Sequence, residues 1–151
     1  MVKTRARNGR IAKCLIVNRD SHILLLTIGD HTKHPHLSYL PDLPGGIIED
    51  TESVYDGMVR EIVEETGIVI DPQHLVRAER KIVSMPWLKR DIEKWLFVID
   101  VDMPEVTLSY EHESYRWVTL EELQNTRFES FYFDDFIQQA VGNYVQLVNG
   151  Q

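Results

Sequence analysis

Short apolar runs separated by turn-forming residues dominate the first part of the chain and predict β-strands. The runs at residues 10–18 (RIAKCLIVN) and 22–28 (HILLLTI) flank a polar turn at 18–21, which indicates a hairpin. Further strands are predicted at 75–84 and 93–101, and a short one near 115–118. The run WLFVI within 93–101 lacks a polar face, so this strand is expected to be central in its sheet.

Helical spacing of apolar residues predicts three helices. The first ends near Thr66, with Asp50 or Thr51 as its N-cap and Gly67 just beyond its last turn. Its apolar positions recur every three or four residues and are expected to face a sheet: Val54, Tyr55, Met58, Val59, Ile62 and Val63. A short capped helix at 119–124 and a final helix at 131–148 follow. This order predicts an α/β (α+β) sandwich with a mixed central sheet between helices.

Length and composition fit one domain over residues 1–151, in which residues 1–9 form a flexible basic tail. The formal net charge of -8 argues against duplex nucleic acid as a partner. No segment has the roughly 20 apolar residues that a membrane span requires. Cys14 is the only cysteine, which excludes an intramolecular disulfide and fits a cytoplasmic protein. The oligomeric state is not readable from the sequence, so a homodimer stays open.

The strongest chemical signal is a cluster of acidic residues on the first predicted helix. Glu61, Glu64 and Glu65 share one helix face because they are three and four positions apart. Three adjacent carboxylates repel one another, and a hard cation such as Mg²⁺ or Mn²⁺ relieves this repulsion while keeping positions for water and phosphate. A solvated acidic face is the alternative for the glutamates alone. The Gly45-Gly46 turn directly before the segment allows close backbone approach and favours a metal and phosphate site.

Residues 46–68 (GIIEDTESVYDGMVREIVEETGI) resemble the Nudix box with every fixed position filled, and Leu-Pro-Gly-Gly at 43–46 is similar to the family's usual lead-in. The resemblance implies a Nudix-like α/β/α sandwich and divalent-metal hydrolysis of a nucleoside diphosphate linked to another group. It implies that three glutamates bind metal and that one of them also acts as a base: Glu61, Glu64 and Glu65. We expect the Gly45 backbone to complete the ligand set. Structural roles fall to Gly46, Glu52, Arg60 and Gly67, with Glu52 and Arg60 as an ion pair.

One more acidic residue is expected from a loop after the sheet strands. The segment at 110–118 (YEHESYRWV) resembles the region where the family often supplies it. Glu111 is the first choice for this additional catalytic and metal-binding acid, beside Glu61 and Glu64, and Glu113 is the second.

The substrate is predicted less sharply than the reaction. Four residues outside the box are predicted to contact it: His36, Tyr39, Arg77 and Trp87. Each of them also fits simple packing or solvation. The loop histidines at positions 31, 34 and 36 suggest a zinc site, but Pro35 and their loop placement argue against one. Pro41 stands where many mutator-type relatives have an aromatic residue, which is a departure from the pattern of the enzymes that remove oxidised nucleotides.

The best single prediction is Mg²⁺-dependent hydrolysis of a nucleoside triphosphate to a nucleoside monophosphate and pyrophosphate. ADP-ribose and dinucleoside polyphosphates are alternative substrates. A non-catalytic Nudix module that only binds a nucleotide is the alternative from another class, and loss of box glutamates would favour it. None of those glutamates is lost.

Overall fold

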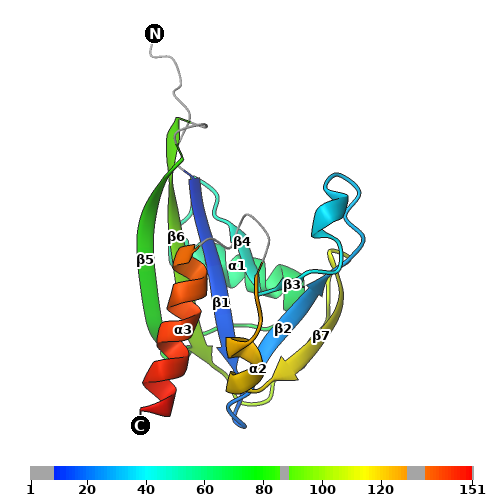
Figure 1. Ribbon diagram of the computed structural model, residues 1–151, viewed down its shortest axis with the longest axis vertical. Coiled ribbons are helices and arrows are strands. Elements are labelled where there is room, and N and C mark those ends of the chain that lie inside the picture. The colour runs from blue at the N-terminus through cyan, green and yellow to red at the C-terminus, as the bar shows by residue number, and fades with distance from the viewer. Residues whose placement is uncertain (1–8, 86–88, 129–134, 151) are drawn as a thin grey trace.

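The computed structural model describes residues 9–85, 89–128 and 135–150, and it arranges them as one mixed sheet between helices (Figure 1). The strands are β1 (Gly9–Val17), β2 (Ile23–Ile28), β3 (Pro41–Asp42), β4 (Gly45–Ile47), β5 (Leu75–Met85), β6 (Arg90–Asp100) and β7 (His112–Val118). The helices are α1 (Val54–Thr66), α2 (Leu120–Gln124) and α3 (Asp135–Asn149), with 3₁₀ turns η1 (Pro35–Leu37) and η2 (Pro72–His74). The predicted α+β sandwich is confirmed.

The sheet order is β3-β2-β1-β6-β5, with β4 paired to β1 and β7 paired to β2. β1 and β6 run parallel over nine residue pairs, from Gly9↔Ile92 to Val17↔Asp100, whereas the other pairs are antiparallel. β6 therefore lies inside the sheet, as its unbroken apolar run predicts.

β1 and β2 diverge from their connecting turn and form a fork (Figure 1). The two strands pair at Val17↔Ile23. Farther along, β4 pairs with Ile11 to Lys13 of β1, while β3 pairs with the end of β2. The Cys14 N–H donates to the Pro44 carbonyl at 2.9 Å. This hydrogen bond attaches the backbone of the Leu-Pro-Gly-Gly segment to β1, on the side where β2 has diverged. The glycine turn is thereby held between two sheet strands.

Alternation along β1 divides the core into two layers. Ala12, Cys14 and Ile16 share one cluster with Met58 and Ile62 of α1. Leu15 and Val17 belong to the other cluster, which includes residues of α2 and α3: Leu123, Ala140, Val141, Tyr144 and Val145. The period-2 pattern of a strand thus packs a helix layer on each face of the sheet.

Three predicted details of the helices and termini change. The N-cap of α1 is Ser53, whose Oγ accepts the Asp56 N–H at 3.0 Å, so the predicted cap at Asp50 or Thr51 is wrong. Val63 is 41% exposed, so the buried apolar stripe of α1 is narrower than predicted. Gly9 begins β1 and is not part of a tail. The rest of the predicted tail, at 1–8, and the predicted helix start at 131–134 lie outside the described residues.

The end of α1 is as predicted. Gly67 follows the last turn with φ 74°, and its N–H donates to the Val63 carbonyl. Only glycine adopts this left-handed conformation without a steric cost.

Candidate active site

An open cavity of about 490 Å³ lies at the fork between β1 and β2. Part of its lining, called the α1 wall below, consists of Glu61, Glu64 and Glu65, and the β4 glycines line it as well. Another part, called the loop wall below, comes from the loop after β2 and from the segment that leads into β7: Asp30, His31, Thr32, Lys33, Tyr110, Glu111 and His112. The fold thus brings residues 28–33, 42–47, 61–65 and 110–112 around one space.

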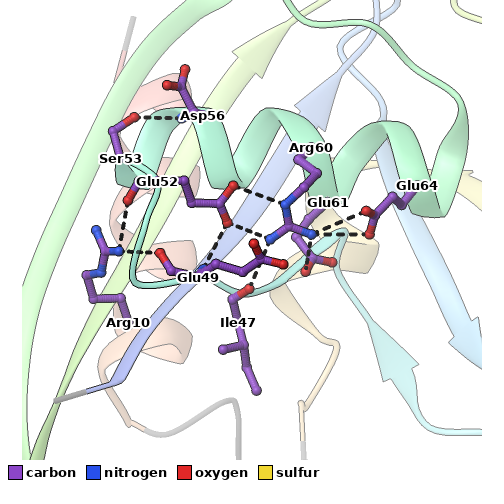
Figure 2. A network of polar contacts seen from close by, with 9 residues as sticks. All are labelled: Arg10, Ile47, Glu49, Glu52, Ser53, Asp56, Arg60, Glu61 and Glu64. Carbon is purple, nitrogen blue, oxygen red and sulfur yellow. Dashed lines mark hydrogen bonds and ion pairs between the residues drawn. The ribbon is translucent and has the colours of Figure 1, made fainter. Parts of the chain in front are cut away.

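Arg60 organises the acidic helix (Figure 2). Its guanidinium makes two hydrogen bonds to the Glu52 carboxylate, Nη2 to Oε1 at 2.6 Å and Nε to Oε2 at 3.1 Å. These bonds lower the pKa of Glu52 to about 2. The remaining nitrogen, Nη1, lies 3.2 Å from a Glu61 oxygen and 3.3 Å from a Glu64 oxygen. The ion pair expected between Glu52 and Arg60 is therefore formed, and it extends to two of the predicted metal ligands.

Arg10 of β1 fixes the loop that precedes α1 (Figure 2). Its Nη2 donates to the Glu49 carbonyl at 2.6 Å and to the Glu52 carbonyl at 2.8 Å. The Glu49 N–H in turn donates to the Glu52 carboxylate at 2.9 Å. Because both ends of Glu52 are held, the partner of Arg60 has a fixed position relative to the sheet.

Glu65 is the most buried acid of the α1 wall, with 5% of its surface exposed. The Gly45 N–H donates to its Oε1 at 2.7 Å. Burial raises the pKa of Glu65 to about 7, although Lys13 and the Gly45 hydrogen bond act in the opposite direction. Burial also raises the pKa of Glu61. A carboxylate that is costly to ionise when alone is well suited to a bound cation.

The two glycines are required by space as well as by backbone conformation. Gly45 has φ 129°, and a Cβ there would lie 2.1 Å from the Ala12 carbonyl oxygen. A Cβ on Gly46 would lie 2.9 Å from a Glu61 carboxylate oxygen. A larger residue would therefore collide with the β1 backbone at Gly45 and with the Glu61 carboxylate at Gly46.

The donor set fits a hard divalent cation. Carboxylate oxygens and the Gly45 carbonyl are the ligand types that Mg²⁺ and Mn²⁺ take. Within residues 9–85, 89–128 and 135–150, no three His, Cys, Asp or Glu side chains already converge as a metal-binding group. Two of the expected ligands, Glu61 and Glu64, instead contact Arg60.

The structure separates the two candidates for the additional acid. Glu111 lines the cavity, and its carbonyl accepts the Gly29 N–H at 2.9 Å, which ties its segment to the end of β2. Glu113 lies on β7, is exposed and is outside the cavity lining. The role of Glu111 as the additional acid stays a prediction.

The residues predicted to contact substrate are not brought together at the cavity. His36 and Tyr39 are exposed and outside its lining, and Tyr39 has φ 67°. Arg77 pairs with Glu79 on the edge strand β5, outside that lining as well. Trp87 lies outside the described residues. Their proposed contacts with substrate stay predictions.

Sequence reasoning missed three buried polar residues that line the cavity. Lys13, Asp42 and His112 are buried and line it together. Lys13 interrupts an apolar strand, and Asp42 directly precedes Leu-Pro-Gly-Gly. A charged side chain at such a position needs a buried partner, and this was the signal that could have identified both residues.

Metal-free Glu65→Gln should be more stable than the wild type at pH 8. A folded-state pKa of about 7 lies above the value of about 4.5 expected in the unfolded chain, so ionising Glu65 costs stability as pH rises from 4.5 to 7. The substituted glutamine avoids that cost, and its amide oxygen can still accept the Gly45 hydrogen bond. Urea unfolding in EDTA at pH 4 and pH 8 measures the difference, which should be near zero at pH 4. A variant that is less stable than the wild type at both pH values would contradict the prediction.

The splayed mixed sheet, the double-glycine turn and the acidic helix α1 together define the class of Nudix proteins. In agreement, the NUDIX domain matches residues 7–138. The chain therefore belongs to the NUDIX domain family. Hydrolases of this family generally use divalent metals such as Mg²⁺.

Individual relatives agree with this assignment. Phosphatase NudJ of Escherichia coli K12 is 31% identical over 85 residues, which are 53% of this chain and 52% of the relative. The chain thus spans about half the length of the curated relatives it matches. The MutT protein of Methanosarcina mazei Go1 has a similar structure, with a TM-score of 0.70, 25% identity and coverage of 99% and 100% of the two chains. An Ap4A hydrolase of C. elegans shares the fold, with a TM-score of 0.67, 16% identity and coverage of 95% and 99%.

No helix among the described residues combines the length and the apolar character needed to cross a bilayer.

Proposed function

We propose that the chain hydrolyses a pyrophosphate bond in a nucleotide, with a nucleoside triphosphate as the preferred substrate and a nucleoside monophosphate and pyrophosphate as products. The observation that carries this proposal is that all four expected acids line the same cavity. Glu61, Glu64 and Glu65 face the same space as the Gly45-Gly46 turn and Glu111. A nucleotide-binding module without catalysis has no need for all of these acids.

The acids and the Gly45 carbonyl would hold Mg²⁺, with Mn²⁺ as a substitute. The bound ion would neutralise the diphosphate and make a bound water more acidic. The oxygen of a water molecule attacks the α-phosphorus of the nucleoside triphosphate. The bond between the α-phosphorus and the oxygen that bridges it to the β-phosphorus breaks, and the electron pair of that bond leaves with pyrophosphate. A cavity glutamate accepts the proton of the attacking water, and Glu61, Glu64 and Glu111 are the candidates for this base.

The loop wall is suited to the rest of the nucleotide. Lys33 and His31 present groups that can contact phosphate oxygens. Tyr110 is 95% exposed at the cavity, so its ring is available for stacking on a base. We therefore assign substrate contacts to these three residues ahead of His36, Tyr39 and Arg77.

A substrate panel tests the proposal. The purified chain is incubated with Mg²⁺ and each of the common nucleoside triphosphates, ADP-ribose and dinucleoside polyphosphates, and products are separated by ion-exchange chromatography. We expect the highest kcat/KM on a nucleoside triphosphate. Higher kcat/KM on ADP-ribose or a dinucleoside polyphosphate would replace the proposed substrate but keep the reaction. Measurable nucleotide binding without any turnover would favour a binding module.

Glu111→Gln should lower kcat by at least about tenfold, because the cavity would lose a metal-binding or proton-accepting oxygen. Glu113→Gln is the matched comparison two positions away, and its kcat should stay within about twofold of the wild type, as for exposed residues outside a site. Steady-state kinetics of both variants on the best substrate of the panel measure this. A larger loss in Glu113→Gln would transfer the role to the second candidate.

A further inference from the structure

A buried chain of polar contacts connects the glycine turn to the segment that carries Glu111. Lys13 Nζ donates to Asp42 Oδ1 at 2.9 Å, and His112 Nε2 lies 2.8 Å from Asp42 Oδ2. Since an ionised carboxylate can only accept, His112 donates from Nε2. The three residues are 4%, 7% and 6% exposed, and they come from β1, β3 and β7. They are called the Lys13–Asp42–His112 relay below.

The relay reaches the glycine turn through Lys13. Its Nζ also lies 3.1 Å from the Leu43 carbonyl oxygen and 3.3 Å from the Gly45 carbonyl oxygen. The Gly45 N–H is bound to Glu65 at 2.7 Å, so both sides of the same residue are fixed. A carbonyl oxygen has two lone pairs, and one hydrogen bond from Lys13 leaves the second for a cation.

The other end of the relay reaches the segment that carries Glu111. His112 directly follows Glu111 in sequence. The same segment is bound to α1, because the Ser109 N–H donates to the Glu65 carbonyl at 3.2 Å. Asp42 thus holds the Glu111 segment and the glycine turn at once, one through His112 and the other through Lys13.

Charge explains why the relay contains both a lysine and an aspartate. A lysine alone beside Gly45 would repel a cation bound at its carbonyl. Asp42 compensates the positive charge, so Lys13 can orient the carbonyl without adding net charge to the site. Buried ion pairs contribute little net stability after desolvation, which makes a positioning role the better explanation for this one.

We propose that Lys13, Asp42 and His112 are positioning residues that hold the Gly45 carbonyl and the Glu111 segment in the geometry required for divalent metal binding. This inference rests on the proposed function. It adds three residues outside the Nudix box that act through Gly45 and Glu111 and do not contact the reacting atoms.

Mn²⁺ binding to the wild type and to variants, followed by electron paramagnetic resonance without any nucleotide, tests the relay. Lys13→Met and His112→Ala should each raise the Mn²⁺ Kd by about tenfold or more, as expected when a contact that orients a metal ligand is lost. His112→Gln offers an amide N–H in place of Nε2 and should restore the Kd to within about threefold of the wild-type value. At saturating metal, kcat should fall by about tenfold in the first two variants, while nucleotide KM stays within about threefold.

The double variant Lys13→Met/Asp42→Asn separates positioning from charge and from folding. Asparagine keeps an amide oxygen that accepts the His112 Nε2–H, so no buried donor on His112 loses its acceptor, and this variant provides a folded protein if Lys13→Met alone unfolds. It also removes the net charge that Lys13→Met would leave on Asp42. We expect its Kd to remain at least about tenfold weaker than that of the wild type. Circular dichroism reports its fold.

Exposed Lys81→Met on β5 is the control and should bind Mn²⁺ as the wild type does. A folded double variant with a wild-type Kd and kcat would overturn the relay and leave the proposed function intact. Absence of Mn²⁺ binding by the wild type would overturn the proposed metal site, and the relay with it.

Discussion

Glu64→Gln should reduce metal-dependent turnover by about 10³-fold or more, which corresponds to about 4 kcal/mol of lost transition-state stabilisation. Glu64 lines the cavity from α1, and its side chain is 57% exposed. Glutamine keeps the size of the side chain but removes the negative charge that a metal ligand or a base requires. Because the side chain is exposed, the free energy of unfolding should change by less than about 0.5 kcal/mol. Steady-state kinetics and urea unfolding of the same preparation measure both quantities.

Glu121→Gln is the matched control for this prediction, because Glu121 is exposed on α2, outside the cavity. Its turnover and its stability should equal those of the wild type. If Glu64→Gln kept more than about a tenth of wild-type turnover, Glu64 could be neither an essential metal ligand nor the base.

Arg60→Ala should destabilise the fold and impair catalysis together. The variant loses two charge-assisted hydrogen bonds to Glu52 and leaves Glu52, Glu61 and Glu64 without their common cation. Since hydrogen bonds to charged groups contribute more than neutral ones, we expect a loss of about 2 kcal/mol in the free energy of unfolding. We also expect at least about tenfold lower kcat, because the metal-binding side chains lose their support. Chemical unfolding and kinetics at saturating Mg²⁺ measure these effects.

Arg19→Ala is the control for Arg60→Ala. Arg19 is exposed, and its Nη1 lies 3.8 Å from an Asp102 oxygen, so the loss should be below about 0.5 kcal/mol. Arg60→Lys keeps the charge but cannot reproduce the paired geometry, and it should fall between the wild type and Arg60→Ala. An Arg60→Ala variant as stable and active as Arg19→Ala would show that Arg60 does not support the site.

Most of the fold was predictable because its elements have strong local patterns. The apolar run of β6 identified an interior strand, and Gly67 marked the end of α1. The N-cap was mispredicted because two candidates preceded Ser53, and the segment before it is held by Arg10, a contact between distant parts of the chain. Local propensity contains no information about such a contact.

The candidate site also has a part that the local sequence predicts and a part that depends on distant contacts. The acidic helix face and the Glu52–Arg60 pair follow from spacing along one short segment, so the sequence predicted their arrangement. The Lys13–Asp42–His112 relay depends on how β1 and β2 diverge, and no spacing rule anticipates that fork. The same limit applies to the loop wall, because the sequence does not show that His31, Lys33 and Tyr110 line the cavity. The sequence suggested His36, Tyr39 and Arg77 as substrate contacts, and these residues lie outside the cavity lining.

Product identification with and without metal is the decisive test of metal-dependent cleavage of a pyrophosphate bond. The purified chain is incubated with its best nucleoside triphosphate and Mg²⁺, and the products are resolved by ³¹P NMR before and after addition of excess EDTA. We expect nucleoside monophosphate and pyrophosphate in equal amounts, with turnover abolished by EDTA and restored by Mg²⁺ or Mn²⁺. Nucleoside diphosphate and orthophosphate as the products, or turnover that EDTA does not change, would contradict it.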